Sequence, residues 1–131
     1  MVQSSMSRCV HQVVPAILRR MGSQFEKPTQ EDQRMKSMAD FYQIARFPRT
    51  IGAIDCTHVA LQPPHDTEHL FRNRKNWHSI NVQVIVDAHG LIWHVCAKFP
   101  GSCHDSYIFR QTNISRELEQ NVYGDSWLVG E

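Results

Sequence analysis

Residues 50–61 read TIGAIDCTHVAL, an apolar run rich in β-branched side chains with one aspartate in its middle. A run of this composition predicts a β-strand. A charged group inside such a strand is costly unless it is paired or binds a cation. Asp55 therefore needs an explanation, because its neighbours Ile54 and Val59 are apolar and do not indicate a polar face of the strand.

Two further strands follow along the chain. Apolar and polar residues alternate over 80–86, which predicts a second strand, although Ile85 breaks the alternation. Residues 87–90 (DAHG) are typical of a turn, with glycine where a positive φ is needed. Residues 91–99 then return as a third strand. Three aromatic side chains in this part of the chain are expected in the core: Trp93, Phe99 and Trp127.

A helical crossover leads to a fourth strand. Pro100 and Gly101 end the third strand, a helix begins at Asp105 or Ser106, and a short strand is predicted at 126–129. Three strands in a meander, followed by a helix and a fourth strand, are typical of the start of an RNase H-like sheet. We therefore expect an α/β fold with an RNase H-like mixed sheet in β-β-β-α-β order.

The N-terminal part predicts helices. A helix capped by Ser4 or Ser5 has apolar positions with a 3.6-residue period as far as Met21. Pro15 lies inside it and predicts a kink or two shorter helices. A second helix is expected between residues 28 and 48, which are both prolines. The first helix has no earlier element to face, and the last strand has nothing after it to cover the sheet, so we expect this sequence to be part of a larger protein.

Composition sets limits on function. Fourteen lysines and arginines against thirteen acidic residues give a net charge of +1, so overall charge does not by itself predict nucleic-acid binding. No apolar run approaches the ~20 residues that span a bilayer, and the N-terminus lacks the pattern of a secretion signal. Four cysteines without C-x-x-C spacing are typical of reduced thiols in an intracellular protein.

Three acids lie at or near predicted strand ends. Asp55 lies within the first strand, Asp105 follows the third, and Glu131 follows Gly130 after the fourth. Carboxylates brought together repel one another, and a divalent cation such as Mg²⁺ or Mn²⁺ removes that repulsion. Alternatives remain open on spacing alone: Asp105 as a helix N-cap, Asp87 as a turn residue, and Glu131 as a solvated chain end.

Several ordered motifs resemble one known family. The motifs are GAIDCTH at 52–58, NRK at 73–75 continuing through HS to VD at 86–87, PGSCHD at 100–105 and SWLVGE at 126–131. Together they resemble the Harbinger transposase-derived nucleases of the DDE superfamily. Upstream, SMSR at 5–8 resembles the recognition helix that closes the family's helix-turn-helix region. The resemblance divides the chain into a helical segment at 1–49 and a partial nuclease domain at 50–131.

The resemblance implies a metal-dependent nuclease that acts on DNA. It implies catalytic and metal-binding roles for Asp55, Asp105 and Glu131, with Mg²⁺ or Mn²⁺ as the cofactor. Glu131 stands where the family usually has aspartate, and the family's final catalytic glutamate lies beyond residue 131. Family members also work with a Myb-like companion protein that supplies DNA binding and nuclear entry, so a nuclear location, with a cytoplasmic pool also conceivable, is expected by resemblance.

A basic segment lies between the first two strands. Arg72, Arg74 and Lys75, flanked by Phe71 and Trp77, are suited to holding phosphates and stacking on an unpaired base. On composition alone an ordinary solvated loop is the better interpretation, and the resemblance shifts the preference to DNA backbone contact.

Two histidines and two cysteines lie beside the acids. His58, three residues after Asp55, is expected on the opposite face of the sheet as a hydrogen-bonded structural residue. His104 is a candidate for a supporting or proton-carrying role beside Asp105. Cys56 and Cys103 are expected to pack, since sulfur is a poor ligand for Mg²⁺.

Three functional hypotheses follow. The first is a metal-dependent nuclease or a fragment of one. The second is a domesticated, non-catalytic nuclear protein that binds DNA or a partner. The third is a partial sequence without a stable fold of its own, because its sheet would lack cover.

Overall fold

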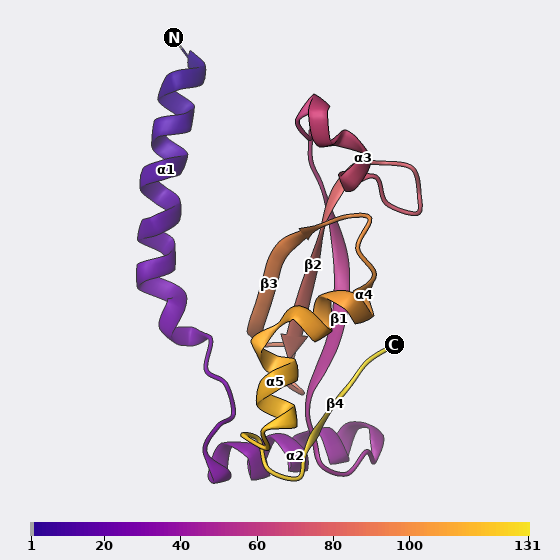
Figure 1. Ribbon diagram of the computed structural model, residues 1–131. Helices are drawn as coiled ribbons and strands as arrows, with labels where there is room; N and C mark the ends of the chain where they lie inside the picture. Colours follow the sequence, from indigo (N-terminus) through magenta and orange to yellow (C-terminus); the bar gives the residue numbers. More distant parts are fainter. Residues whose placement is uncertain (1) are drawn as a thin grey trace.

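A four-stranded mixed sheet forms the centre of the molecule (Figure 1). The computed structural model describes the backbone of residues 2–131 and the side chains from residue 4 onward. The strands are β1 (Thr50–Ala60), β2 (Ser79–Val86), β3 (Ile92–Pro100) and β4 (Trp127–Val129). Their order is β3-β2-β1-β4, with β1 antiparallel to β2, β2 antiparallel to β3, and β4 parallel to β1. The predicted α/β fold with an RNase H-like mixed sheet is confirmed.

The buried face of β2 is the polar one. Asn81, Gln83 and Ile85 are almost fully buried, whereas Val82 and Val84, which alternate with them, are only partly buried. The alternation that predicts the strand would ordinarily place the valines against the core. The helices after β3 instead pack on the face that carries Asn81, Gln83 and Ile85. Ile85, which breaks the alternation in the sequence, is therefore a core residue.

Two short helices cover this face (Figure 1). They are α4 (Asp105–Gln111) and α5 (Asn113–Glu119), separated by the buried Thr112. The sequence predicted one continuous helix here. Thr112 has extended φ and ψ angles, and its hydroxyl donates to the carbonyl of Phe109, which ends α4.

A single cluster of buried side chains joins the sheet to α5. Its members are Ile51, Ile85, Trp93, Ile114 and Tyr123. The expectation that Trp93 is a core residue is therefore confirmed.

The other two aromatic residues expected in the core differ from Trp93. Phe99 is only partly buried. Trp127 is 43% exposed, so its prediction was wrong. The Trp127 ring lies beneath the Arg49 guanidinium, 5.8 Å from it, at the surface edge of β4.

Helix α1 (Val2–Met21) stands apart from the sheet (Figure 1). It is one helix that includes Pro15, so the alternative of two shorter helices was wrong, and it begins before the predicted serine caps. Every described side chain in it is exposed, including the apolar ones. Within the described residues, no helix has the length and apolarity needed to cross a membrane.

Helix α2 (Glu31–Ala45) runs beneath the sheet and contacts the start of β1 (Figure 1). A short 3₁₀ turn, η1 (Gly22–Gln24), connects it with α1. The link between β1 and β2, predicted as a loop, contains a 3₁₀ turn, η2 (His65–Thr67), and a one-turn helix, α3 (Glu68–Phe71). Residues 72–78, between α3 and β2, form the basic loop.

Candidate metal and nucleic-acid site

The three predicted acids line one hollow of about 250 Å³ beside β1. Asp55 comes from the middle of β1, Asp105 from the first residue of α4, and Glu131 from just after β4. Gly130 allows the last of these to come close. A Cβ at that position would lie 2.5 Å from the Ile54 carbonyl oxygen, so only glycine lets the chain after β4 run this close to β1.

Asp105 is held by the neighbouring strand and not by its own helix. The Asn81 side-chain amide donates to Asp105 Oδ1 at 2.8 Å and to the Cys103 carbonyl at 3.0 Å. The N-cap position belongs to His104, and no side chain caps the helix. The N-cap alternative for Asp105 was therefore wrong, and its carboxylate is directed toward β2.

Asp55 is hydrogen-bonded to the backbone beside it. Its Oδ1 accepts a hydrogen bond from the backbone N–H of the next residue, Cys56, at 2.7 Å, and the side chain is exposed. Within the part of the chain that the structure describes, no three histidine, cysteine, aspartate or glutamate side chains are grouped so as to hold a metal ion.

The chemistry of the hollow nevertheless fits a hard divalent cation. Besides the carboxylates, the hollow is lined by Gln83, whose buried amide oxygen Oε1 has no hydrogen-bond partner. Oxygen ligands of this kind suit Mg²⁺ or Mn²⁺. Asp55, Asp105 and Glu131 would hold the ion.

Cys56 is an unreactive thiol at the wall of the hollow. Burial and the neighbouring Asp105 carboxylate raise its pKa to about 12, and Gln83 Nε2 lies 3.9 Å from its sulfur. Burial also raises the pKa of Cys103. All four cysteines are free thiols. A protonated thiol is a weak ligand for a hard cation, which agrees with the packing role expected for Cys56 and Cys103.

The basic loop divides into two parts. Arg74 and Lys75 line a second hollow, which Cys56 and Asp105 separate from the first. Arg72 does not line it; its backbone forms an isolated bridge with His78 instead. Of the three predicted DNA-binding cations, the structure thus brings two together beside the acids.

The remaining predicted polar residues have structural positions. His58 Nδ1 is hydrogen-bonded to Ser79 Oγ at 2.9 Å, as expected for a structural histidine. Asp87 Oδ1 accepts from the backbone N–H groups of His89 and Leu91, which confirms it as a turn residue. The His104 ring is exposed at the start of α4.

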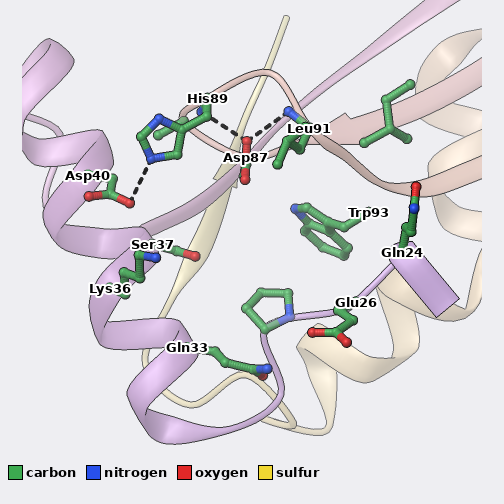
Figure 2. Close-up of a pocket in the computed structure, with 13 residues that line it drawn as sticks. Gln24, Glu26, Gln33, Lys36, Ser37, Asp40, Asp87, His89, Leu91 and Trp93 are labelled. Carbon is green, nitrogen blue, oxygen red and sulfur yellow. Dashed lines mark hydrogen bonds and ion pairs between the residues drawn. The ribbon is translucent and has the colours of Figure 1, made fainter.

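A third hollow lies between α2 and the turn after β2 (Figure 2). Asp87 lies at its edge, and His89 reaches across to Asp40, with 3.2 Å between His89 Nε2 and Asp40 Oδ2. None of the predicted catalytic acids lines this hollow. The pair of His89 and Asp40 connects the turn with α2, and this hollow is separate from the acid hollow.

Sequence reasoning missed Asn81 and Gln83. Both belong to the motif between residues 73 and 87, where the sequence indicates only that they form the polar half of an alternating strand. The available signal was Ile85, which shares their face and is apolar. An apolar residue in register with two amides indicates that this face is buried, and buried amides need partners.

The mixed four-stranded sheet and its covering helices form an α/β domain with an RNase H-like fold. The sequence profile of the family described as DDE superfamily endonuclease matches residues 54–131. Three curated relatives carry the name "Putative nuclease HARBI1": the rat protein is 38% identical over 130 residues, the human protein 35% over 130 and the Xenopus laevis protein 31% over 131. The chain belongs to the DDE superfamily of endonucleases.

These comparisons cover only part of the relatives. The matches include 98% of this chain but 37% of the length of each relative. No solved structure matches the chain significantly. The chain thus spans about a third of the length of these relatives, and an activity of the whole relatives can only be proposed for it.

Proposed function

We propose that this chain is part of a DNA nuclease whose divalent metal ion, Mg²⁺ or Mn²⁺, is held by Asp55, Asp105 and Glu131. The observation that supports this is the shared hollow: three acids from three separate elements of a DDE endonuclease line one space. When bound, such an ion would polarise a phosphodiester and lower the pKa of an attacking water. A nuclear location belongs to the same proposal, since DNA is the substrate.

The protein's own residues would orient the substrate. Asn81 fixes the Asp105 carboxylate, and Gly130 brings Glu131 alongside β1. Arg74 and Lys75, at the second hollow, would hold the DNA backbone near these acids, and Arg72 would add a more distant backbone contact.

Metal binding is tested by thermal unfolding with increasing Mn²⁺ or Mg²⁺. An ion at 100 times its dissociation constant raises the free energy of unfolding by about 2.7 kcal/mol. Saturable stabilisation is expected in the wild type and not in Asp55→Ala or Asp105→Asn. Asp66→Asn, an exposed acid in η2, is the matched control and should respond like the wild type. Equal stabilisation of Asp55→Ala and the wild type would contradict the proposal.

A second candidate is a non-catalytic nuclear protein that binds DNA or a partner, such as a Myb-like companion. One observation favours it: the described acids do not converge on a metal position. DNA binding that is identical with Mg²⁺ and with a chelator, together with no metal-induced stabilisation, would support this function. Both experiments measure binding.

A further inference from the structure

The second hollow lies directly beside the acids. Its volume is about 450 Å³, within the range of roughly 300–1,000 Å³ typical of small-ligand sites. One wall is β1 and the other is the loop 73–77, and Cys56 and Asp105 border both this hollow and the acid hollow. A linear ligand lying across the acids would therefore extend into it.

A buried asparagine builds the loop. Asn73 is 5% exposed, and its Oδ1 accepts hydrogen bonds from the backbone N–H groups of Lys75 (2.9 Å) and Trp77 (3.3 Å). Its Nδ2 donates to Ser79 Oγ at 3.1 Å, and its backbone N–H donates to the Trp77 carbonyl at 2.9 Å. These four bonds order the loop before any ligand arrives, which lowers the entropy cost of binding.

The loop presents an aromatic ring and two cations to the same space. Trp77 is 36% exposed and meets the His58 ring edge-on, with 6.0 Å between the ring centroids. Arg74 and Lys75 are exposed, and within the described residues neither side chain has a recorded hydrogen bond or ion pair. An aromatic face beside two unpaired cations suits a base and a phosphate of one nucleotide.

The geometry favours an unpaired nucleotide over a base pair. A base inside a duplex is stacked on both sides and offers Trp77 no free face, whereas an unpaired base can stack on it. The hollow lies at the border of Asp105, so such a nucleotide would neighbour a phosphodiester held at the acids.

We propose that the hollow between β1 and loop 73–77 binds one unpaired nucleotide of the DNA strand, with its base on Trp77 and its phosphate at Arg74 and Lys75. The inference rests on the proposed function for the identity of the strand as DNA, but binding in this hollow needs no metal ion.

The test is the affinity of the full chain for a fluorescein-labelled 12-nucleotide single strand and for a duplex of the same sequence, both measured in chelator. Stacking contributes about 1–3 kcal/mol per base, so Trp77→Ala should weaken single-strand binding by about 5- to 160-fold. It should change duplex affinity by less than about twofold, and Trp77→Phe should restore most of the single-strand affinity. Tyr42→Ala, another exposed aromatic, is the control.

The phosphate contact is read from the salt dependence. Each phosphate contact on a single strand contributes about 0.7 to the slope of log affinity against log salt, so Arg74→Ala with Lys75→Ala, which removes the one phosphate contact proposed here, should reduce the slope by about 0.7. Lys98→Ala, an exposed cation on β3, should leave the slope unchanged.

Three results would overturn the inference: no single-strand binding by the wild type, equal losses for single strand and duplex, or Trp77→Phe as weak as Trp77→Ala while both unfold at the wild-type temperature. These outcomes are distinct from failure of the metal proposal. Loss of metal-induced stabilisation with an intact Trp77 effect would leave the nucleotide hollow standing, and the reverse pattern would leave the metal site standing.

Discussion

Asn81 joins β2 to the first turn of α4 through its side-chain amide. It is 1% exposed, and its Nδ2 donates two side-chain hydrogen bonds, one to Asp105 and one to the Cys103 carbonyl. If a carboxylate replaced the Asn81 amide, the Asp105 carboxylate would lose its donor and face a second negative charge in a space with little water. An aspartate at position 81 would therefore destabilise the folded protein relative to asparagine.

Asn81→Asp should lower the free energy of unfolding at pH 7 by about 2–4 kcal/mol, through lost hydrogen bonds and repulsion. The repulsion raises the pKa of the carboxyl pair in the folded state, so the loss relative to the wild type should shrink as the pH falls from 7 to 4. Urea unfolding at several pH values measures this. Asn81→Leu should show a loss that does not depend on pH, and the same pH dependence in both variants would contradict the account.

His94 makes folding sensitive to acid. Burial and the positive charge of Lys27 lower its pKa from 6.5, although Glu117 acts in the opposite direction. The unfolded chain therefore takes up a proton near pH 6.5 that the folded protein does not. Stability is fully present above that pH and declines as the pH falls through the folded-state pKa of His94.

His94→Gln should flatten the pH dependence of the unfolding free energy as the pH falls below about 6.5, since the titrating group is removed. Once the pH is below the folded-state pKa of His94, the curves of wild type and variant should run parallel, because carboxylates then dominate the pH dependence. Glu117 is one of these: burial raises its pKa, but hydrogen bonds from Tyr123 and Lys27 lower it overall. Identical slopes for wild type and variant near pH 6 would show that His94 does not contribute.

At the scale of elements, α1 and α5 differ in their relation to the core. Helix α5 supplies Ile114, which is completely buried against Ile85 and Tyr123. Helix α1 has a regular apolar stripe, but Val10 and Val14 on it are 55% and 47% exposed. An amphipathic pattern stabilises a protein only where the apolar face is covered.

Val10→Ser with Val14→Ser should change the unfolding free energy of the sheet by less than about 0.5 kcal/mol, as expected for exposed positions. Ile114→Ala should lower it by about 2–4 kcal/mol, because it leaves a cavity in the core. Chemical unfolding followed by fluorescence of the buried Trp93 compares the two. A loss above 1 kcal/mol in the α1 variant would show that this helix packs on the domain.

On the scale of the whole molecule, a polar network connects the segment before α2 with α5. Lys27 Nζ donates to both Glu117 oxygens, at 2.9 and 3.0 Å, and the Tyr123 hydroxyl donates to Glu117 Oε2. Lys27 and Glu117 are 90 residues apart in sequence. Both are partly exposed, so solvent screens their attraction.

A double-mutant cycle of Lys27→Met and Glu117→Gln should give a coupling energy of about 0.5–1 kcal/mol in favour of the native pair. The coupling should decrease when salt is raised from 0.1 to 1 M, because salt shortens the distance over which exposed charges attract each other. A cycle of Lys36→Met with Glu117→Gln, whose members share no recorded contact, is the control and should give no coupling. Zero coupling for Lys27 would mean that the N-terminal segment is not fastened to the domain through this pair.

The sequence by itself predicted the strands, the turn at Asp87 and the family. These depend on short-range chemistry: β-branched composition gives a strand, an aspartate and a glycine form a turn, and several motifs in order are specific for one superfamily. Gly130 and Glu131 were also recognisable as a motif at the end of β4. None of these features requires knowledge of what lies on either side of the sheet.

Only the tertiary structure decided which face of β2 is covered, and with it the surroundings of the acids. Alternation in a sequence gives a strand two faces but does not say which of them the later helices cover. Because α4 and α5 pack on the face of Asn81 and Gln83, two amides are buried beside Asp105, and loop 73–77 brings Arg74 and Lys75, but not Arg72, to the same place. These arrangements depend on contacts between residues distant in the chain, which local pattern does not encode.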